Sequence, residues 1–240
     1  MLQPIIIALD FSSKEEVNRF LSSFRGEELF VKVGMELFYQ EGPDLLRMLK
    51  DHGHHIFLDL KLHDIPTTVY KAMKGLAKLE VDLVNVHAMG GVEMMKRSIE
   101  GLEEGSLHNR PKCIAVTQLT SSTTAFINSE LSIQGTVEQS VTKLASQAEI
   151  ARLDGVVCSP LEVPLVRRNC RESFLTITPG IRTERDRLDD QKRVTTPLEA
   201  KKLGSNFIVV GRSITKAKDP FQTYQFIKEE WGTSYETTSR

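Results

Sequence analysis

The sequence alternates between two kinds of segment along nearly its whole length, and this alternation limits the fold more than any single residue does. Short runs rich in apolar and β-branched residues are each followed by a longer stretch whose apolar residues recur at helical spacing. The short runs predict strands at residues 5–9, 29–33, 55–60, 83–87, 112–117, 155–158, 174–178 and 207–210. The longer stretches predict helices at residues 14–24, 43–51, 66–79, 92–102, 137–149, 161–167, 197–203 and 221–230.

Eight strands that alternate with eight helices predict an α/β protein built as a closed (β/α)8 TIM barrel. An open doubly wound sheet is the alternative, but the first strand lacks the glycine-rich turn of a dinucleotide-binding fold. A length of 240 residues suits one barrel, and no Pro-, Ser- or Gly-rich linker divides the pattern. We therefore expect a single barrel domain at residues 1–231 and a polar tail at residues 232–240.

Two connections are longer than ordinary turns: residues 121–135 follow the fifth strand, and residues 180–196 follow the seventh. Long ordered loops in compact domains usually serve a function. The segment 182–196 mixes acidic and basic residues with Gln191 and has no apolar periodicity. It could be a solvated loop, but we favour a lid that closes over a ligand.

Charge and composition exclude several classes of partner. The 31 basic and 32 acidic residues give a net charge of −1, so no long-range field attracts nucleic acid or an anionic membrane. No apolar stretch approaches the roughly 20 residues that span a bilayer, and the amino terminus carries no basic leader. Three cysteines without paired metal-ligand spacing indicate reduced thiols. We expect a soluble, cytoplasmic protein that binds neither nucleic acid nor membrane.

One histidine-rich segment, His52-Gly53-His54-His55, is reminiscent of a metal site. It precedes the third predicted strand, however, and so belongs to the end of the barrel opposite the usual active site. We interpret it as a solvated turn and predict no metal site.

Polar residues interrupt the apolar runs at the carboxyl ends of the first four predicted strands, where a barrel builds its active site. Because side chains alternate along a strand, residues two apart share a face, and Asp59 and Lys61 should look into the same space. We expect one pocket to contain Asp10, Lys32, Asp59, Lys61, Asn85 and His87.

Three of the charged residues in this region, Asp59, Lys61 and Asp64, also have a purely structural interpretation. Asp64 stands just before Ile65-Pro66, an ordinary helix start, so it could cap the following helix. Asp59 and Lys61 could be an internal ion pair. Two lysines and three carboxylates are nevertheless too many ions for a core that gains little from burying them. Their number favours an active site.

The charge pattern also narrows the chemistry. Lys61 has carboxylates on both sides in sequence, which stabilise its protonated form. A Schiff base needs a neutral amine and is therefore disfavoured. A protonated lysine beside carboxylates suits a reaction that develops negative charge on carbon and then protonates that carbon, as decarboxylation does.

The loops after the seventh and eighth strands carry glycines followed by arginines, and barrels often bind phosphate there. The segments are Thr178-Pro179-Gly180-Ile181-Arg182 and Gly211-Arg212-Ser213-Ile214. Either alone could be a plain turn with a solvated arginine. Together they predict a phosphorylated ligand held by charge-assisted hydrogen bonds.

These motifs resemble the orotidine 5′-monophosphate decarboxylase family, of the bacterial type, over nearly the whole chain. The family's central motif Asp-x-Lys-x-x-Asp-Ile-Pro-x-Thr is intact between Asp59 and Thr68. Other matching segments are Ala8-Leu9-Asp10, Lys32-Val33-Gly34, Leu119-Thr120-Ser121, Pro179-Gly180-Ile181-Arg182, Gln191 and Val210-Gly211-Arg212.

The resemblance implies that Lys61 protonates C6 of the pyrimidine after CO₂ leaves, with Asp59 beside the departing carboxylate and no cofactor. It implies a catalytic network of Lys32, Asp59, Lys61 and Asp64. Asp10 and Lys32 would meet the ribose, Thr120 the pyrimidine, and Gln191, Gly211 and Arg212 the phosphate, with Arg182 nearby. The implied substrate contacts are Asp10, Lys32, Asp59, Ile65, Thr68, Thr120, Pro179, Arg182, Gln191, Gly211 and Arg212.

The resemblance further implies a homodimer, because Asp64, Ile65 and Thr68 of the family reach into the active site of the other subunit. Two alternatives stay open. A keto-gulonate phosphate decarboxylase shares Asp-x-Lys-x-x-Asp but needs Mg²⁺, and Ile65-Pro66-x-Thr68 argues against it. A non-catalytic barrel that binds a phosphorylated ligand would explain the glycine loops but not the network of lysines and carboxylates.

Overall fold

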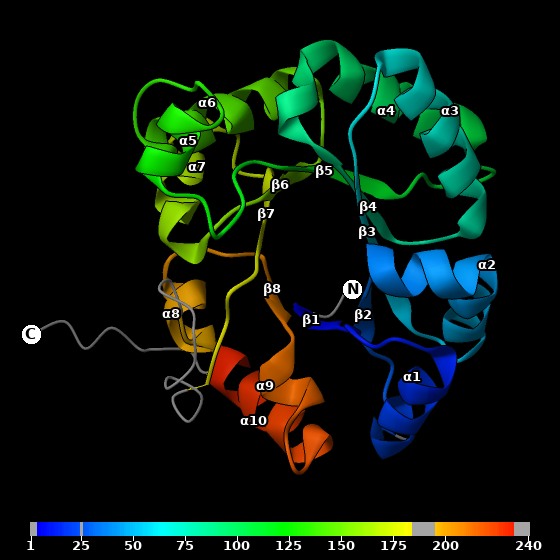
Figure 1. The fold of residues 1–240 in the computed structure, drawn as a ribbon. Helices are drawn as coiled ribbons and strands as arrows, with labels where there is room; N and C mark the ends of the chain where they lie inside the picture. The colour runs from blue at the N-terminus through cyan, green and yellow to red at the C-terminus, as the bar shows by residue number, and fades with distance from the viewer. Residues whose placement is uncertain (1–3, 25, 184–194, 233–240) are drawn as a thin grey trace, which may run out of the picture.

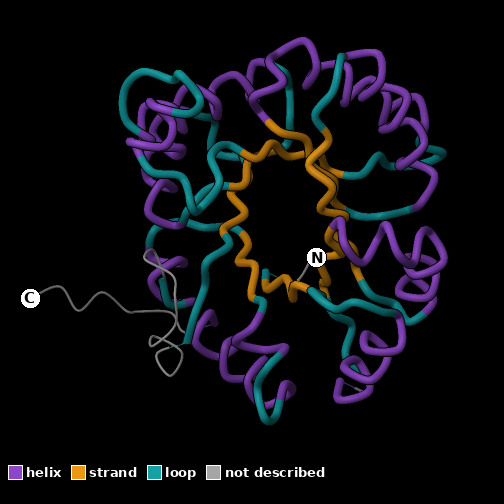
Figure 2. Tube along the Cα trace, in the orientation of Figure 1, coloured by secondary structure: helices purple, strands orange, loops and turns teal. Residues whose placement is uncertain are grey.

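The computed structural model describes residues 4–24, 26–183 and 195–232, which form a closed barrel of eight parallel strands surrounded by helices (Figures 1 and 2). The strands pair in chain order, and β1 also pairs with β8. They are β1 (Ile5–Ala8), β2 (Phe30–Gly34), β3 (His55–Leu62), β4 (Leu83–His87), β5 (Lys112–Val116), β6 (Gly155–Val157), β7 (Leu175–Thr178) and β8 (Phe207–Val210). The predicted TIM barrel is confirmed.

The α-helices of the described residues lie on the outside of the barrel. They are α1 (Lys14–Leu21), α2 (Met35–Asp51), α3 (Pro66–Leu76), α4 (Gly91–Gly105), α5 (Thr124–Ser129), α6 (Val137–Ile150), α7 (Val163–Asn169), α8 (Pro197–Lys202), α9 (Arg212–Thr215) and α10 (Pro220–Gly232). Short 3-10 helices occupy Ser22–Phe24, Ala77–Leu79, Ala88–Gly90 and Pro160–Glu162. None of the helices in the described ranges is long and apolar enough to cross a membrane.

Helices also occupy three places where the sequence predicted none. α2 begins at Met35 instead of residue 43, because Gly42 adopts φ 63° and joins two helical pieces across a kink before Pro43. α5 lies inside the expected loop 121–135, where the hydroxyl of Thr123 accepts a hydrogen bond from the N–H of Phe126 and caps it. α9 follows β8 directly. The predicted loop 121–135 is therefore interrupted by a helix, and so is the connection between β8 and α10.

Alternation along the strands divides the apolar residues into two cores. Odd-numbered residues of β1, such as Ile5 and Ile7, pack outward against the helices. A fully buried phenylalanine side chain contributes about 1.5–3 kcal/mol to the free energy of unfolding, so the rings that fill the interior stabilise the closed barrel substantially. The interior layer consists of Ile6, Ala8, Phe30, Phe57, Leu83, Ile114, Ile177 and Val209.

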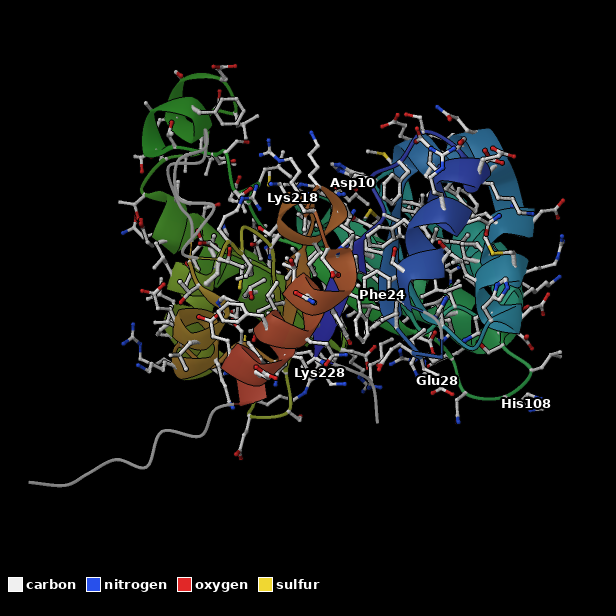
Figure 3. All side chains as sticks on the ribbon, turned by 90° about the horizontal axis from the view of Figure 1, so that it is seen from below. Asp10, Phe24, Glu28, His108, Lys218 and Lys228 are labelled. Atoms are coloured by element: carbon white, nitrogen blue, oxygen red, sulfur yellow. The ribbon has the colours of Figure 1, made fainter. Side chains whose placement is uncertain are left out.

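The two ends of the barrel carry different residues. Figure 3 shows Asp10, which follows β1, at the same end as Lys218, whereas Glu28 and His108 lie at the opposite end. Glu28 precedes β2 and His108 precedes β5, so the strands run from that end toward Asp10. The carboxyl ends of the strands, and the loops that follow them, therefore gather around Asp10.

Candidate active site

A layer of polar side chains lies directly above the apolar layer in the barrel. Lys32 follows Phe30 by two residues, Asp59 follows Phe57, and Asn85 follows Leu83, so each polar residue repeats the inward direction of an apolar one. Asp59 is 8% exposed and Asn85 only 1%. The inward-facing positions of these strands therefore change from apolar residues to polar and charged ones toward the carboxyl ends.

Four charged side chains, carried by β2, by β3 and by the residues after β1, form a continuous chain of alternating charges. The ammonium of Lys32 lies 3.2 Å from Oδ1 of Asp10 and 3.3 Å from Oδ2 of Asp59. The ammonium of Lys61 donates to Oδ1 of Asp59 at 2.6 Å. Each lysine therefore lies against at least one carboxylate. The expected convergence of Asp10, Lys32, Asp59 and Lys61 is thus present.

Lys61 reaches Asp59 by a different route from the regular strand that we expected. Its backbone adopts φ 52°, a left-handed conformation that costs a non-glycine residue about 1–2 kcal/mol. The pairing of β3 with β4 also shifts register between Leu58 and Leu62. A bulge, and not the two-residue period, therefore aims the lysine, as bulges commonly do beside active sites.

Asp59 is an ionised carboxylate held in a buried place. Burial alone would raise its pKa, but Lys32 and Lys61, together with hydrogen bonds from Lys61 and Asn85, outweigh burial and hold the pKa below its ordinary value. Removing one partner of such a buried pair leaves the other charge without compensation, which is strongly destabilising. Asp59 thus provides fixed negative charge at neutral pH.

A cavity of about 310 Å³ opens beside this chain of charges. Lys32, Asp59 and Lys61 form one wall, and Thr120 and Pro179 lie on others. The remaining lining residues are Phe57, Val116, Gln118, Leu119, Ser121, Val157, Cys158 and Val209. The cavity therefore combines ionic and apolar walls, as small-molecule sites commonly do.

A second cavity, of about 620 Å³, lies where the sequence predicted a phosphate site. It is lined by Arg182 and Arg212, each three residues beyond a residue that lines the first cavity, Pro179 and Val209. Gly211 stands at the start of α9. Other lining residues include Thr183, Ser213, Lys216 and Lys218. Gln191, and the lid predicted for most of 182–196, lie outside the described residues.

The segment Asp64 to Thr68 lies on the surface of the chain. Asp64, Ile65 and Thr68 are exposed, and the side chain of Ile65 is 66% exposed. The helix-capping interpretation of Asp64 is wrong: the N-cap of α3 is Ile65, and the carboxylate of Asp64 accepts a hydrogen bond from the N–H of Ile65 instead. The structure of the single chain does not bring these residues into the chain of charges.

Comparison with known proteins decides the family. The family model described as Orotidine 5′-phosphate decarboxylase / HUMPS family matches residues 3–227. The chain belongs to this family. Relatives named orotidine 5′-phosphate decarboxylase, from Geobacillus sp. (strain WCH70) and Bacillus cereus (strain B4264), are each 58% identical over 233 residues, covering 96% of this chain and 98% of the relative. The resemblance inferred from the sequence is confirmed.

Solved structures agree with this assignment to the orotidine 5′-phosphate decarboxylase / HUMPS family. Orotidine 5′-phosphate decarboxylase from Lactobacillus acidophilus has a TM-score of 0.87 at 44% identity, covering 96% of this chain and all of the other. An uncharacterized conserved protein from Geobacillus kaustophilus has a TM-score of 0.86 at 50% identity, covering 95% of this chain and all of the other. The barrel is therefore shared closely with both proteins.

The histidine-rich turn before β3 is less solvated than we predicted. His54 is 6% exposed, and its Nδ1 accepts a hydrogen bond from the N–H of Leu29. Nδ1 of His55 lies 2.9 Å from a carboxylate oxygen of Asp82. These rings thus tie strands together at the end opposite Asp10. Over the part of the chain that the structure describes, no group of three or more His, Cys, Asp or Glu side chains could hold a metal ion.

His87 ends β4 on the same side of the barrel as Lys61, and it is paired with a second histidine. Its ring stacks on that of His63, with centroids 5.6 Å apart, and its Nδ1 accepts from the N–H of Met89. Burial, and then the nearby His63 and Lys61, lower the pKa of His87. The ring of His87 is therefore neutral in the folded chain at neutral pH.

This shift predicts a measurable dependence of stability on pH. The pKa of His87 is lower in the folded chain than in the unfolded chain, so between the two values the unfolded chain binds more protons and stability falls as pH falls. His87→Asn keeps an acceptor for Met89 but cannot titrate. We expect its thermal unfolding midpoint to drop less than the wild-type midpoint between about pH 7.5 and about pH 5.5. His108→Asn, at an exposed position, is the control; equal drops in wild type and His87→Asn would contradict the assignment.

Proposed function

We propose that this chain decarboxylates orotidine 5′-monophosphate to UMP and CO₂, the last step of de novo UMP synthesis, without a metal or organic cofactor. The observation that carries the proposal is the charge chain Asp10–Lys32–Asp59–Lys61, whose last three members line a partly apolar cavity. The names of the relatives at 58% identity support it. A binding protein without catalysis would have no use for a buried carboxylate held between two lysines beside its cavity.

Asp59 and Lys61 have complementary roles in the proposed reaction. The substrate carboxylate enters beside Asp59, and the repulsion between the two anions favours departure of CO₂. The bond between C6 and the carboxyl carbon breaks, and its electron pair remains on C6. The ammonium of Lys61 stabilises that negative charge and then donates a proton to C6. The resulting neutral amine regains a proton from water.

The remaining contacts hold the nucleotide in place. The pyrimidine occupies the 310 Å³ cavity near Thr120 and Pro179. Asp10 and Lys32 bind the ribose, a role supported by their position at the mouth of β1 and β2. The phosphate lies in the cavity lined by Arg182 and Arg212, with Gly211 and Gln191 as further contacts.

The working species is a homodimer in which Asp64, Ile65 and Thr68 complete the site of the partner. This proposal is supported by apolar side chains that are between 39% and 66% exposed and follow the ends of four consecutive strands, β2 to β5. Exposed apolar patches of this kind mark interaction surfaces. The residues are Met35, Ile65, Met89 and Leu119.

Residues 1–231 act as one catalytic domain in this proposal, and the protein works in the cytoplasm. The free thiols of Cys113, Cys158 and Cys170 suit a reducing compartment. The phosphate of the substrate is bound by local cations, since the net charge of −1 provides no wider attraction.

Metal independence separates this proposal from the Mg²⁺-dependent keto-gulonate phosphate decarboxylases. We expect turnover of orotidine 5′-monophosphate to be unchanged in excess chelator, because Lys61 supplies the positive charge that a metal ion would otherwise supply. A Mg²⁺-dependent decarboxylase of the rival type, assayed in the same buffer, shows that the chelator is effective. Complete loss of turnover that returns when Mg²⁺ is added would contradict the cofactor-free mechanism.

A further inference from the structure

Asn85 occupies a singular place in the barrel, opposite the bulge that aims Lys61. Leu58 of β3 pairs with Val84 of β4, and Leu62 pairs with Val86. Between these two pairs, β3 has three residues and β4 has one. That one residue is Asn85, which is 1% exposed. A regular ladder cannot satisfy the extra backbone groups of β3 at this point.

The side chain of Asn85 provides what the ladder lacks. Its Oδ1 accepts a hydrogen bond from the backbone N–H of Lys61 at 2.7 Å. Its Nδ2 donates to Oδ1 of Asp59 at 2.7 Å. An ionised carboxylate only accepts and a backbone N–H only donates, so the amide cannot be flipped without losing both bonds. The orientation of this side chain is therefore fixed by chemistry.

The two bonds act on the two groups that the reaction uses. One holds the backbone of Lys61 in its left-handed conformation, at φ 52°. The other contacts the same oxygen, Oδ1 of Asp59, that receives the ammonium of Lys61 at 2.6 Å. One amide thus fixes both the base of the lysine and the carboxylate against which its ammonium rests.

We propose that Asn85 is a positioning residue for decarboxylation, which aligns Asp59 and the ammonium of Lys61 with the reacting carbon without touching the substrate. This inference rests on the roles proposed above for Asp59 and Lys61. Asparagine is required because the position needs one donor and one acceptor, neutral and in a short side chain. Leucine would fill the space and provide neither bond, and aspartate would provide the acceptor but set a second carboxylate against Asp59.

The first test is Asn85→Ala, measured by kcat and KM for orotidine 5′-monophosphate and by calorimetric binding of UMP. We expect kcat to fall about 100-fold, as for a small misplacement of reacting groups, while KM and UMP affinity change little. Asn206→Ala is the matched control. Oδ1 of Asn206 accepts from the N–H of Thr176 at the amino-terminal end of β8, the end of the barrel opposite Asp10, so this variant should lose stability without losing kcat.

The second test is Asn85→Asp, which keeps the shape of the side chain and carries the test if Asn85→Ala does not fold. The introduced carboxyl faces Asp59 and the backbone of Lys61, with Lys32 beyond Asp59 and His87 two residues along β4. When ionised it repels Asp59; when protonated it can donate to Asp59 as the amide does. We expect kcat relative to wild type to rise as pH falls for Asn85→Asp, and to stay level for Asn85→Ala.

Three outcomes overturn the proposal. Wild-type kcat in either variant at neutral pH would show that Asn85 does not position the site. An equal loss of kcat in Asn206→Ala would show that the effect is one of general stability. A ratio of kcat values that stays level with pH for Asn85→Asp would remove the role of the donor. Lys61→Ala in the same assay distinguishes failure of the Asn85 proposal from failure of the proposed function. Wild-type turnover in Lys61→Ala would overturn the proposed function itself.

Discussion

Lys61→Ala should lower kcat for orotidine 5′-monophosphate by about 10²- to 10⁴-fold, the range that a positioned general acid contributes. The variant loses the group that stabilises the carbanion and the group that protonates it, and both functions reside in one ammonium. It also leaves Asp59, 8% exposed, with one cation fewer. Nucleotide binding should survive, because we propose that other residues hold the phosphate and the ribose.

The measurement combines steady-state kinetics with calorimetric binding of UMP. Lys143→Ala, which removes an exposed lysine on α6, is the control for loss of a positive charge. If Lys61→Ala turns over at the wild-type rate, Lys61 is not the proton donor. If instead UMP binding is lost along with turnover, the lysine serves binding and not chemistry.

Mixing two inactive variants should restore activity if the sites are shared between subunits. In a hybrid of Lys61→Ala with Asp64→Ala, one site carries both changes and the other carries neither. Random exchange makes about half of the dimers hybrid, so turnover should recover to about a quarter of the wild-type value. Each variant alone should stay far below that level.

The control for this experiment is a mixture of Lys61→Ala with Asp59→Ala. Both residues belong to the charge chain within one subunit, so no hybrid site is intact and no activity should return. Subunit exchange is followed by native mass spectrometry of isotope-labelled protein. Exchange without recovery in the Lys61→Ala and Asp64→Ala mixture would show that Asp64 does not act across the dimer.

The barrel could be predicted from the sequence because its signal is repeated eight times. Each strand is a short apolar run, and errors of one or two residues at its ends leave the order of elements unchanged. The helices were less certain where the signal is local. Gly42-Pro43 reads as a helix start, so the helical piece before it was missed, although Gly42 only kinks α2.

The charged residues of the site could also be predicted, because ions are conspicuous at the ends of apolar strands. The geometry that joins them could not. Period two brings Asp59 and Lys61 to one face of a regular strand, whereas the structure uses a bulge with Lys61 at φ 52°. A left-handed lysine leaves no mark in composition or periodicity, since it is stabilised by a residue of the next strand.

The role of Asn85 could not be predicted either, because it depends on contacts between strands. The sequence shows a polar residue near the end of β4 but indicates no role for it, because its two partners come from β3 and lie 24 and 26 residues away. The capping interpretation of Asp64 had the opposite weakness. It was a sound local rule, and it was wrong because Ile65 provides the N-cap of α3.

The most direct test of the central claim is turnover of orotidine 5′-monophosphate by the purified protein in D₂O. The ammonium of Lys61 exchanges its protons with solvent, so the account predicts UMP that carries one deuterium at C6, seen as loss of the C6 proton signal by NMR and a gain of one mass unit. No formation of UMP, or UMP that has acquired ordinary hydrogen at C6, would contradict it.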